Sequence, residues 1–294
     1  MDLDLNEDQV ALRDGIASML TAKVPIERVR AGFDRALFDE LAAAGVFSLR
    51  NDGFSWSDCV VVFEQLGRAC VPGPLVSSLL VGDGRIVGVL NNGWVEHFDT
   101  LDTVLWPPLG ECEPATLDAE TSSWPLDPGT PITRIVSEPA GYTPVDIDWL
   151  AFGQAGAVLT AAFQLGLADR LTEMAVEYAK ERKQFDRPIG GFQAIKHLCS
   201  DMLVRTEVAR AAVYAAGAHL DTGDDLPGLG RAVSGAKLLA GEAAVTNGKT
   251  ATQVFGGMGF TWEVDVHLYL KRAWVLDTHF GSADAHADAV AASL

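Results

Sequence analysis

The sequence predicts a mainly α-helical protein with an N-terminal helical domain, a reduced middle β segment and a C-terminal four-helix bundle. Apolar residues recur at helical spacing near the start of the chain and, more strongly, over its second half. Between these regions, short β-type runs alternate with Pro, Gly and acidic turns. We therefore divide the chain into residues 1–84, 85–147 and 148–294.

Capping and breaking residues delimit three helices in the N-terminal region. Asn6 and Asp34 each precede a helical apolar pattern and can accept hydrogen bonds from the first free N–H groups. Gly45 closes the second helix. A third helix is expected over residues 57–70, and Pro72 stops it because proline cannot continue a helix.

The middle segment contains three β-type runs, at residues 85–90, 103–106 and 132–136. Turn residues separate them. The segment has room for a few strands but not for a barrel large enough to enclose a ligand.

The C-terminal region carries four helical patterns, over residues 153–183, 192–219, 230–255 and 264–280. The connections between them are short. Four antiparallel helices with short connections make a bundle, so this region is expected to form one.

Composition excludes several classes of function. With 22 Lys+Arg against 40 Asp+Glu, the formal net charge is −18, which disfavours nucleic acid and anionic lipid as partners. No uninterrupted apolar run approaches the roughly 20 residues of a membrane span, and the acidic N-terminus is unlike a signal peptide. We expect a cytoplasmic protein. The four cysteines show no metal-ligand spacing and are expected to be reduced thiols: Cys59, Cys70, Cys112 and Cys199.

The first motif candidate lies between two predicted helices. Arg182 ends one helix, Phe185 can anchor the turn, Pro188 prevents helical continuation, and Gln193 faces the turn from the next helix. An arginine and an amide at helix ends suit a phosphate-bearing ligand. The alternative is that Arg182 merely caps its helix and Gln193 is a solvated amide.

The second candidate is the segment that follows Gln253. Gly256, Gly257 and Gly259 fall within four residues between two helices. A plain turn needs one glycine, so three imply positive φ or a close backbone approach.

Together these motifs resemble those of the acyl-CoA dehydrogenases, and the resemblance is close to full length. Arg-x-x-Phe-x-x-Pro-Ile-x-x-Phe-Gln is followed by Gln-x-x-Gly-Gly-x-Gly-Phe in a helical C-terminal region. The resemblance implies FAD as the cofactor, held mainly by a neighbouring subunit, with this chain contacting its pyrophosphate and ADP portion. The matched cofactor-binding residues are Arg182, Phe185, Gln193, Gln253, Gly256 and Gly257.

The chain departs from the family pattern where the catalytic base is expected. The usual Glu-Gly after the last long helix corresponds to Phe280-Gly281, and the alternative base position falls near Gly156. Neither side chain can take a proton, so no catalytic residue is assigned. Three titratable residues remain as possible substitutes, although solvated or capping roles are commoner for such groups: Asp284, His279 and Glu263.

Two further departures concern the flavin. The middle segment is too short for the family's β-barrel, which holds the flavin ring. Asp186 replaces the usual glycine after the motif phenylalanine. An acid there repels a pyrophosphate unless Arg187 neutralises it or it points away.

We therefore interpret the chain as one subunit of a heteromeric acyl-CoA dehydrogenase. A full-length partner would supply the catalytic glutamate, the flavin ring pocket and most of the acyl-CoA site. The resemblance extends to actinobacterial heterotetramers, with two copies of each subunit, that oxidise steroid side-chain CoA thioesters. Two alternatives remain open: a self-sufficient homomeric enzyme with a displaced base, Asp284 or Glu263, and a non-catalytic scaffold subunit.

Overall fold

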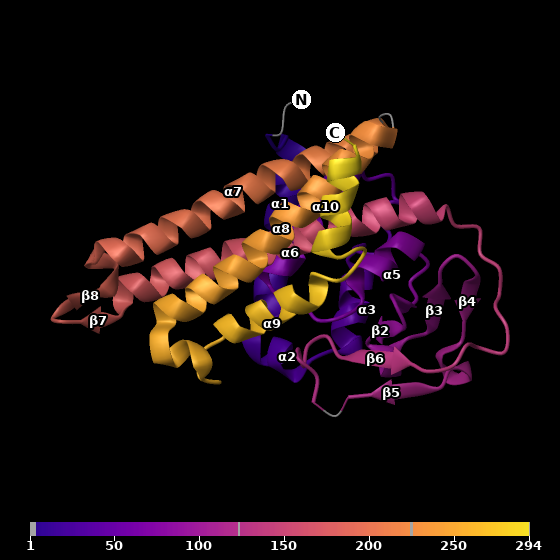
Figure 1. Cartoon of the computed structure of the whole chain (residues 1–294), viewed down its shortest axis with the longest axis horizontal. Helices are drawn as coiled ribbons and strands as arrows, with labels where there is room; N and C mark the ends of the chain where they lie inside the picture. Colours follow the sequence, from indigo (N-terminus) through magenta and orange to yellow (C-terminus); the bar gives the residue numbers. More distant parts are fainter. Residues whose placement is uncertain (1–3, 123, 224–225, 294) are drawn as a thin grey trace.

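The computed structural model describes residues 4–122, 124–223 and 226–293, so what was expected of residues 1–3 and 294 lies outside the described residues. The fold is mainly helical, as the sequence predicts (Figure 1). Its α-helices are α1 Glu7–Lys23, α2 Ile26–Ala31, α3 Arg35–Ala43, α4 Trp56–Arg68, α5 Leu75–Val81, α6 Trp149–Glu181, α7 Gln193–Thr222, α8 Leu226–Phe255, α9 Val266–Leu276 and α10 Ala283–Ala292.

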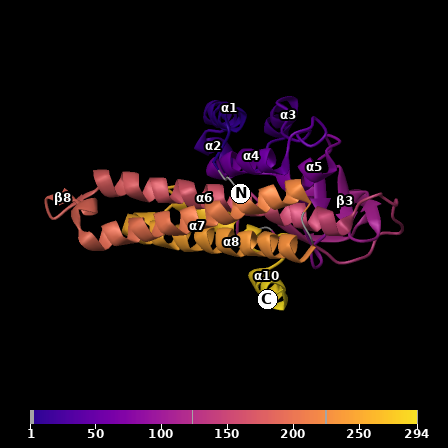
Figure 2. The same cartoon turned by 90° about the horizontal axis from the view of Figure 1, so that it is seen from above.

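Three long helices, α6, α7 and α8, run side by side and form the body of the molecule (Figures 1 and 2). Helix α6 is the central element, because it packs against α4 as well as against α7 and α8. Within the described part of the chain it is also the one helix long and apolar enough to cross a membrane. In its most apolar window 72% is buried, which fits the core helix of the bundle.

The N-terminal helices pack on one side of the bundle (Figure 2). The Asn6 and Asp34 caps form as predicted, and Ser55 caps α4. Helix α4 approaches α6 closely because both carry glycine at the crossing. A Cβ on Gly67 or Gly166 would stand 2.0 Å from a backbone carbonyl oxygen of the other helix.

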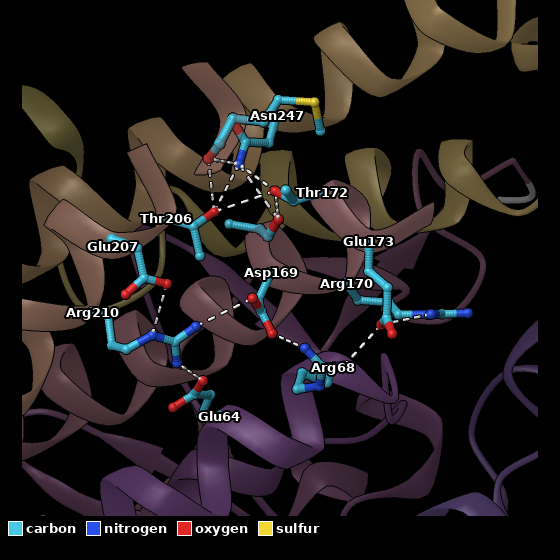
Figure 3. A network of polar contacts seen from close by, with 12 residues as sticks. Glu64, Arg68, Asp169, Arg170, Thr172, Glu173, Thr206, Glu207, Arg210 and Asn247 are labelled. Atoms are coloured by element: carbon cyan, nitrogen blue, oxygen red, sulfur yellow. Dashed lines mark hydrogen bonds and ion pairs between the residues drawn. The ribbon is translucent and has the colours of Figure 1, made fainter. Parts of the chain in front are cut away.

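Polar contacts fix the same helices against one another (Figure 3). The Asn247 amide of α8 donates to the Thr206 hydroxyl at 3.0 Å and the Thr172 hydroxyl at 3.2 Å, joining three helices in the core. Nearby, Arg210 of α7 pairs with the buried Glu64 of α4. These groups stabilise the bundle from inside, because their own buried polar atoms are hydrogen-bonded or ion-paired.

The middle segment forms two small sheets. In the first, the strand order is β1-β3-β4, with β1 parallel to β3; in the second it is β2-β6-β5, with antiparallel pairs. No closed barrel is formed by the described residues, in agreement with the short sequence. The strands are β1 Val87–Val89, β2 Trp94–Glu96, β3 Thr103–Trp106, β4 Gly110–Cys112, β5 Ala119–Thr121 and β6 Ile132–Ile135.

A fourth helix forms within the predicted range of 264–280, but it is shorter than expected. Helix α9 ends at Leu276, and α10, which the sequence interpretation missed, follows at Ala283–Ala292. Two features stop α9. The Lys237 ammonium of α8 donates to the Leu276 and Asp277 carbonyls, and Phe280 and Gly281 both adopt positive φ.

Candidate functional site

The first sequence motif lies at one end of the bundle. Helix α6 ends at Glu181, and the chain turns through a hairpin of β7 (Lys183–Gln184) and β8 (Arg187–Pro188) and the short helix η3 (Ile189–Gly191). Figure 1 shows this hairpin at the tip of the long helices.

Arg182 and Gln193 flank this turn. The N–H of Arg182 donates to the Tyr178 carbonyl at 2.8 Å, and the Arg182 carbonyl accepts from the N–H of Ile189, also at 2.8 Å. Gln193 is the first residue of α7. Both motif side chains are exposed, so they are available to a group from outside the chain.

The second motif follows the end of α8. Gln253 lies in its last turn, and Gly256–Phe260 form the 3-10 helix η4. The rings of Tyr178 and Phe255 stack with centroids 4.1 Å apart, which ties the end of α6 to the end of α8. The structure thus brings the two motifs to the same end of the bundle. We call the exposed residues there, Arg182, Gln193, Gln253 and Gly257, the motif end.

The three glycines differ in what they do. Gly256 has φ +61, a conformation that favours glycine. A Cβ on Gly259 would stand 2.6 Å from the Thr252 carbonyl oxygen, so packing requires glycine there. Gly257 has neither feature, since its φ is not positive and a Cβ would meet nothing within 4 Å. The described fold does not require Gly257, and its backbone is open to approach from outside.

The expectation that Phe185 anchors the turn is wrong. Its side chain is 86% exposed, and its ring meets Phe192 edge-on at a centroid distance of 6.0 Å. Phe185 has φ +52 and Asp186 φ +59, as a two-residue hairpin of this kind requires, and both residues stay exposed at the tip.

Arg187 does not neutralise Asp186. Its guanidinium lies 4.0 Å from the centroid of the Phe192 ring, and no ion pair joins it to Asp186 in the described residues. A pyrophosphate at the motif end would therefore meet an unneutralised carboxylate on the hairpin. Arg182 is the counter-charge: its guanidinium has no side-chain partner in the part of the chain that the structure describes.

These groups fit a diphosphate-bearing cofactor. A guanidinium with no partner can form two parallel hydrogen bonds with phosphate oxygens. The Gln193 and Gln253 amides and the open backbone at Gly257 add further contacts. The chemistry of the motif end is suited to binding a cofactor tail, and none of its four residues is a candidate catalytic base.

The two base positions inferred from the sequence converge in the fold. A Cβ on Gly156 of α6 would stand 2.2 Å from Cδ1 of Phe280, so the phenylalanine ring lies directly on that glycine. The ring also packs toward Phe152, with centroids 6.1 Å apart. An aromatic ring thus fills the space beside Gly156, at the two positions that the sequence resemblance assigns to a base.

The loop that carries Phe280 is held firmly. Phe280 has φ +54, an unusual value for a large side chain. The His286 ring bridges the Phe280 carbonyl at 3.0 Å and the Ser234 hydroxyl at 3.1 Å. Lys237 binds the end of α9, and burial lowers the pKa of its ammonium to about 8.

A cavity of about 470 Å³ lies beside Phe280, between the middle sheets and α9. Of the substitutes considered from sequence, His279 lines it, while Asp284 and Glu263 are exposed and line no part of it. Its apolar wall includes Val89, Leu90, Trp94, Trp274, Val275 and Phe280.

The acid that does line this cavity is Glu96, which the sequence interpretation missed. Its Oε2 lies 3.6 Å from Nδ1 of His279. Burial raises the pKa of Glu96 to about 7 and lowers that of His279 to about 4. Glu96 ends the short strand β2 and has no motif around it, so only the tertiary structure pairs it with His279.

Comparisons with known proteins agree with this architecture. The family model for the acyl-CoA dehydrogenase C-terminal domain matches residues 153–294. The acyl-CoA dehydrogenase IpdE2 of Mycobacterium tuberculosis is 32% identical over 300 residues, covering 91% of each chain. Among solved structures, a chain of the ChsE4-ChsE5 complex from the same organism superposes with a TM-score of 0.82 at 21% identity, covering 99% of this chain and 98% of that one.

A chain of the steroid acyl-CoA dehydrogenase Tcur3481-Tcur3483 superposes with a TM-score of 0.79 at 20% identity, covering 98% of this chain and 97% of that one. At such identities the structural likeness shows the fold alone. The long-helix bundle with its small β segment therefore defines an acyl-CoA dehydrogenase-like fold. With the extended relationship to IpdE2, the chain belongs to the acyl-CoA dehydrogenase family, a family of FAD-dependent dehydrogenases.

Proposed function

We propose that this chain is a companion subunit of a heteromeric acyl-CoA dehydrogenase. It contributes contacts to the FAD pyrophosphate and ADP portion in trans, and its full-length partner supplies the catalytic glutamate, the flavin ring pocket and most of the acyl-CoA site. The assembly is a cytoplasmic heterotetramer with two copies of each subunit, and its substrate is the CoA thioester of a steroid side chain.

The observation that carries this proposal is the contact between Phe280 and Gly156. Dehydrogenation of an acyl-CoA requires a base that removes the α-proton while the flavin accepts the β-hydride. Phenylalanine and glycine occupy both base positions, so the chemistry falls to another chain. FAD supplies the redox chemistry when bound.

The residues of this chain would bind and orient rather than react. Arg182 neutralises phosphate charge, Gln193 and Gln253 donate amide hydrogen bonds, and Gly257 lets its backbone approach the cofactor. Phe185 and Gly256 complete the proposed contact set: an exposed ring at the hairpin tip and the positive-φ turn that begins η4.

Two further observations support assembly with a partner. Helix α7 exposes Leu203, Val204 and Val208, with 52%, 60% and 48% of their surfaces accessible. Exposed apolar side chains gathered on one helix favour burial against another subunit. The ChsE4-ChsE5 and Tcur3481-Tcur3483 structures are named as two-component assemblies, and the latter as a steroid enzyme.

Flavin occupancy of the assembled complex tests the proposal. The chain is co-expressed with candidate full-length dehydrogenases, and FAD per complex is measured by absorbance. We expect Arg182→Ala to weaken FAD binding about tenfold or more, because a charge-assisted hydrogen bond is worth about 1.5–3 kcal/mol. Arg134→Ala removes the same charge from an exposed site on β6, outside the motif end, and is the control.

A scaffold subunit would leave FAD occupancy unchanged in Arg182→Ala, so equal occupancy in both variants would refute the proposal. A self-sufficient enzyme is the second candidate, and one observation favours it: the buried carboxyl of Glu96 lines the cavity beside Phe280. In that case the chain purified alone would be yellow, substrate would bleach it, and Glu96→Gln would abolish the bleaching.

A further inference from the structure

The cavity beside Phe280 has the form of a ligand site within this single chain. Its volume of about 470 Å³ falls in the range of small-molecule pockets, about 300–1,000 Å³. Trp94, Leu126 and Trp274 line it while 45%, 51% and 39% of their surfaces remain accessible. Large apolar side chains that stay exposed around one opening indicate a surface that receives an apolar molecule.

The only ionisable side chains among the residues that line this cavity are Glu96 and His279, and both are mostly buried. The side chain of each is 16% exposed, and their closest atoms are 3.6 Å apart. With its pKa lowered to about 4, His279 is neutral at pH 7. Burial raises the pKa of Glu96 to about 7, so its acid and carboxylate forms are both accessible near neutral pH. The polar end of the cavity therefore offers both a donor and an acceptor at low charge.

A second, water-sized void of about 20 Å³ lies behind the same pair. Glu96 and His279 line it together with Thr160 and Arg272. The Thr160 hydroxyl is buried and has no hydrogen-bond partner in the described residues. A void of this volume can hold one water molecule, and a buried hydroxyl without a partner favours such a water. The pair thus has the ligand-sized cavity on one side and a water-sized void with an unpartnered hydroxyl on the other.

We propose that the cavity binds an uncharged, largely apolar molecule that carries one hydroxyl or keto oxygen, and that Glu96 and His279 recognise this oxygen. A hydroxyl can donate to the Glu96 carboxylate, and a ketone can accept from the protonated form. A ligand carboxylate is disfavoured because the apolar wall would desolvate it and Glu96 would repel it. All the residues that line this cavity belong to this one chain.

A matched pair of probes tests the charge preference, 1-pyrenemethanol and 1-pyrenecarboxylate. Binding to the full chain is measured by energy transfer from tryptophan to pyrene, because Trp94 and Trp274 line the cavity. We expect saturable binding of the alcohol, and binding of the carboxylate at least tenfold weaker. Equal affinity for the two probes, or no saturable binding of the alcohol, would overturn the proposal.

Two variants test the role of the pair. Glu96→Ala should weaken binding of the alcohol about tenfold, whereas Glu96→Gln, which keeps an uncharged donor and acceptor, should stay within about threefold of the native chain. Glu120→Ala removes an exposed carboxylate of β5 that lies outside the cavity lining, and should change nothing. If Glu96→Ala does not fold, the comparison of probes on the native chain and the Glu96→Gln result still decide the question.

The outcomes distinguish a failure of this ligand-site proposal from a failure of the function proposed above. Failure of the alcohol to bind leaves the effect of Arg182→Ala on FAD occupancy untouched, and the converse also holds. Glu96→Gln also separates recognition from catalysis. A recognition site keeps its ligand in this variant, whereas an enzyme that used Glu96 as base would lose its activity.

Discussion

The motif end and the centre of the molecule use charged groups in opposite ways. At the motif end, Arg182 is exposed and has no side-chain partner in the described residues. At the centre, Arg272 is 3% exposed and pairs with Asp127, which is equally buried. The first arginine is therefore available to a group outside the chain, whereas the second holds the chain itself together.

Arg272 joins all three regions of the sequence. It lies on α9, its Nη1 donates to the Val71 carbonyl at 2.9 Å, and its Nε donates to the Asp127 carboxylate of the middle segment. A Cβ on Gly129 would stand 2.3 Å from Nη2 of Arg272, so the loop closes directly over the guanidinium. The guanidinium lowers the pKa of Asp127 despite the opposing effect of burial.

Removing Arg272 is expected to have the largest effect. Arg272→Met keeps much of the volume but leaves Asp127 as a buried charge without its partner, which costs about 3–5 kcal/mol in free energy of unfolding. Chemical denaturation measures this, with Arg182→Met as the matched control, expected within about 0.5 kcal/mol of the native chain. Arg272→Met with Asp127→Asn should recover part of the loss. Similar losses of free energy of unfolding in Arg272→Met and Arg182→Met would contradict the contrast between the two arginines.

The second test follows the pH dependence of stability at the centre. Because burial raises the pKa of Glu96 from 4.5 to about 7, the folded state keeps its proton longer than the unfolded state. Stability attributable to Glu96 is therefore complete below pH 4.5 and is lost as pH rises to about 7. The loss is at most about 3–4 kcal/mol, at about 1.4 kcal/mol per pKa unit.

The Glu96→Gln variant separates the pH-dependent loss of stability due to Glu96 from the contributions of the other titratable groups nearby. Relative to the native chain, the variant should gain free energy of unfolding steadily between pH 4.5 and 7 and then level off. His279 acts oppositely, since its lowered pKa makes the folded state lose stability as pH falls below 6.5, and it is present in both chains. If the difference in free energy of unfolding between Glu96→Gln and the native chain did not change with pH, the burial of Glu96 would be contradicted. The other titratable groups around the pair are His97, Asp127, Lys237 and Arg272.

Local chemistry explains which parts of the fold the sequence could predict. The caps at Asn6 and Asp34 act within three residues of themselves, so a local pattern is enough to find them. The end of α9 depends instead on Lys237 from another helix, and the extension to residue 280 was therefore wrong. The Glu96–His279 pair likewise joins residues far apart in sequence, and no local signal could reveal it.

The residues of the candidate site also fall into two groups: those that a local sequence pattern could indicate and those that required the tertiary structure. The family motif could indicate Arg182 and Gln193, because their residue types and spacing lie within one segment. It could not show that Phe185 would stand outside the turn, since that depends on the positive φ of a two-residue hairpin. The convergence of Phe280 and Gly156 also required the tertiary structure, although both positions were named from sequence.

The smallest expected effect distinguishes two glycines of the second motif, Gly257 and Gly259. Gly259→Ala should lower the free energy of unfolding by about 1–3 kcal/mol, because its Cβ would stand 2.6 Å from the Thr252 carbonyl oxygen. Gly257→Ala meets no neighbour, so stability should be unchanged or up to about 1 kcal/mol higher.

The effects of the two variants on FAD occupancy should follow the opposite order to their effects on stability. In the assembled complex, Gly257→Ala places a methyl group where the backbone is open, and FAD occupancy should fall. Gly259→Ala should leave the occupancy of the folded fraction near that of the native complex. Denaturation curves and FAD absorbance on the same two variants provide both measurements. If Gly257→Ala changed neither the free energy of unfolding nor the FAD occupancy, the proposal that a ligand approaches the backbone at Gly257 would be contradicted. Neither packing nor binding would then explain a glycine at this position.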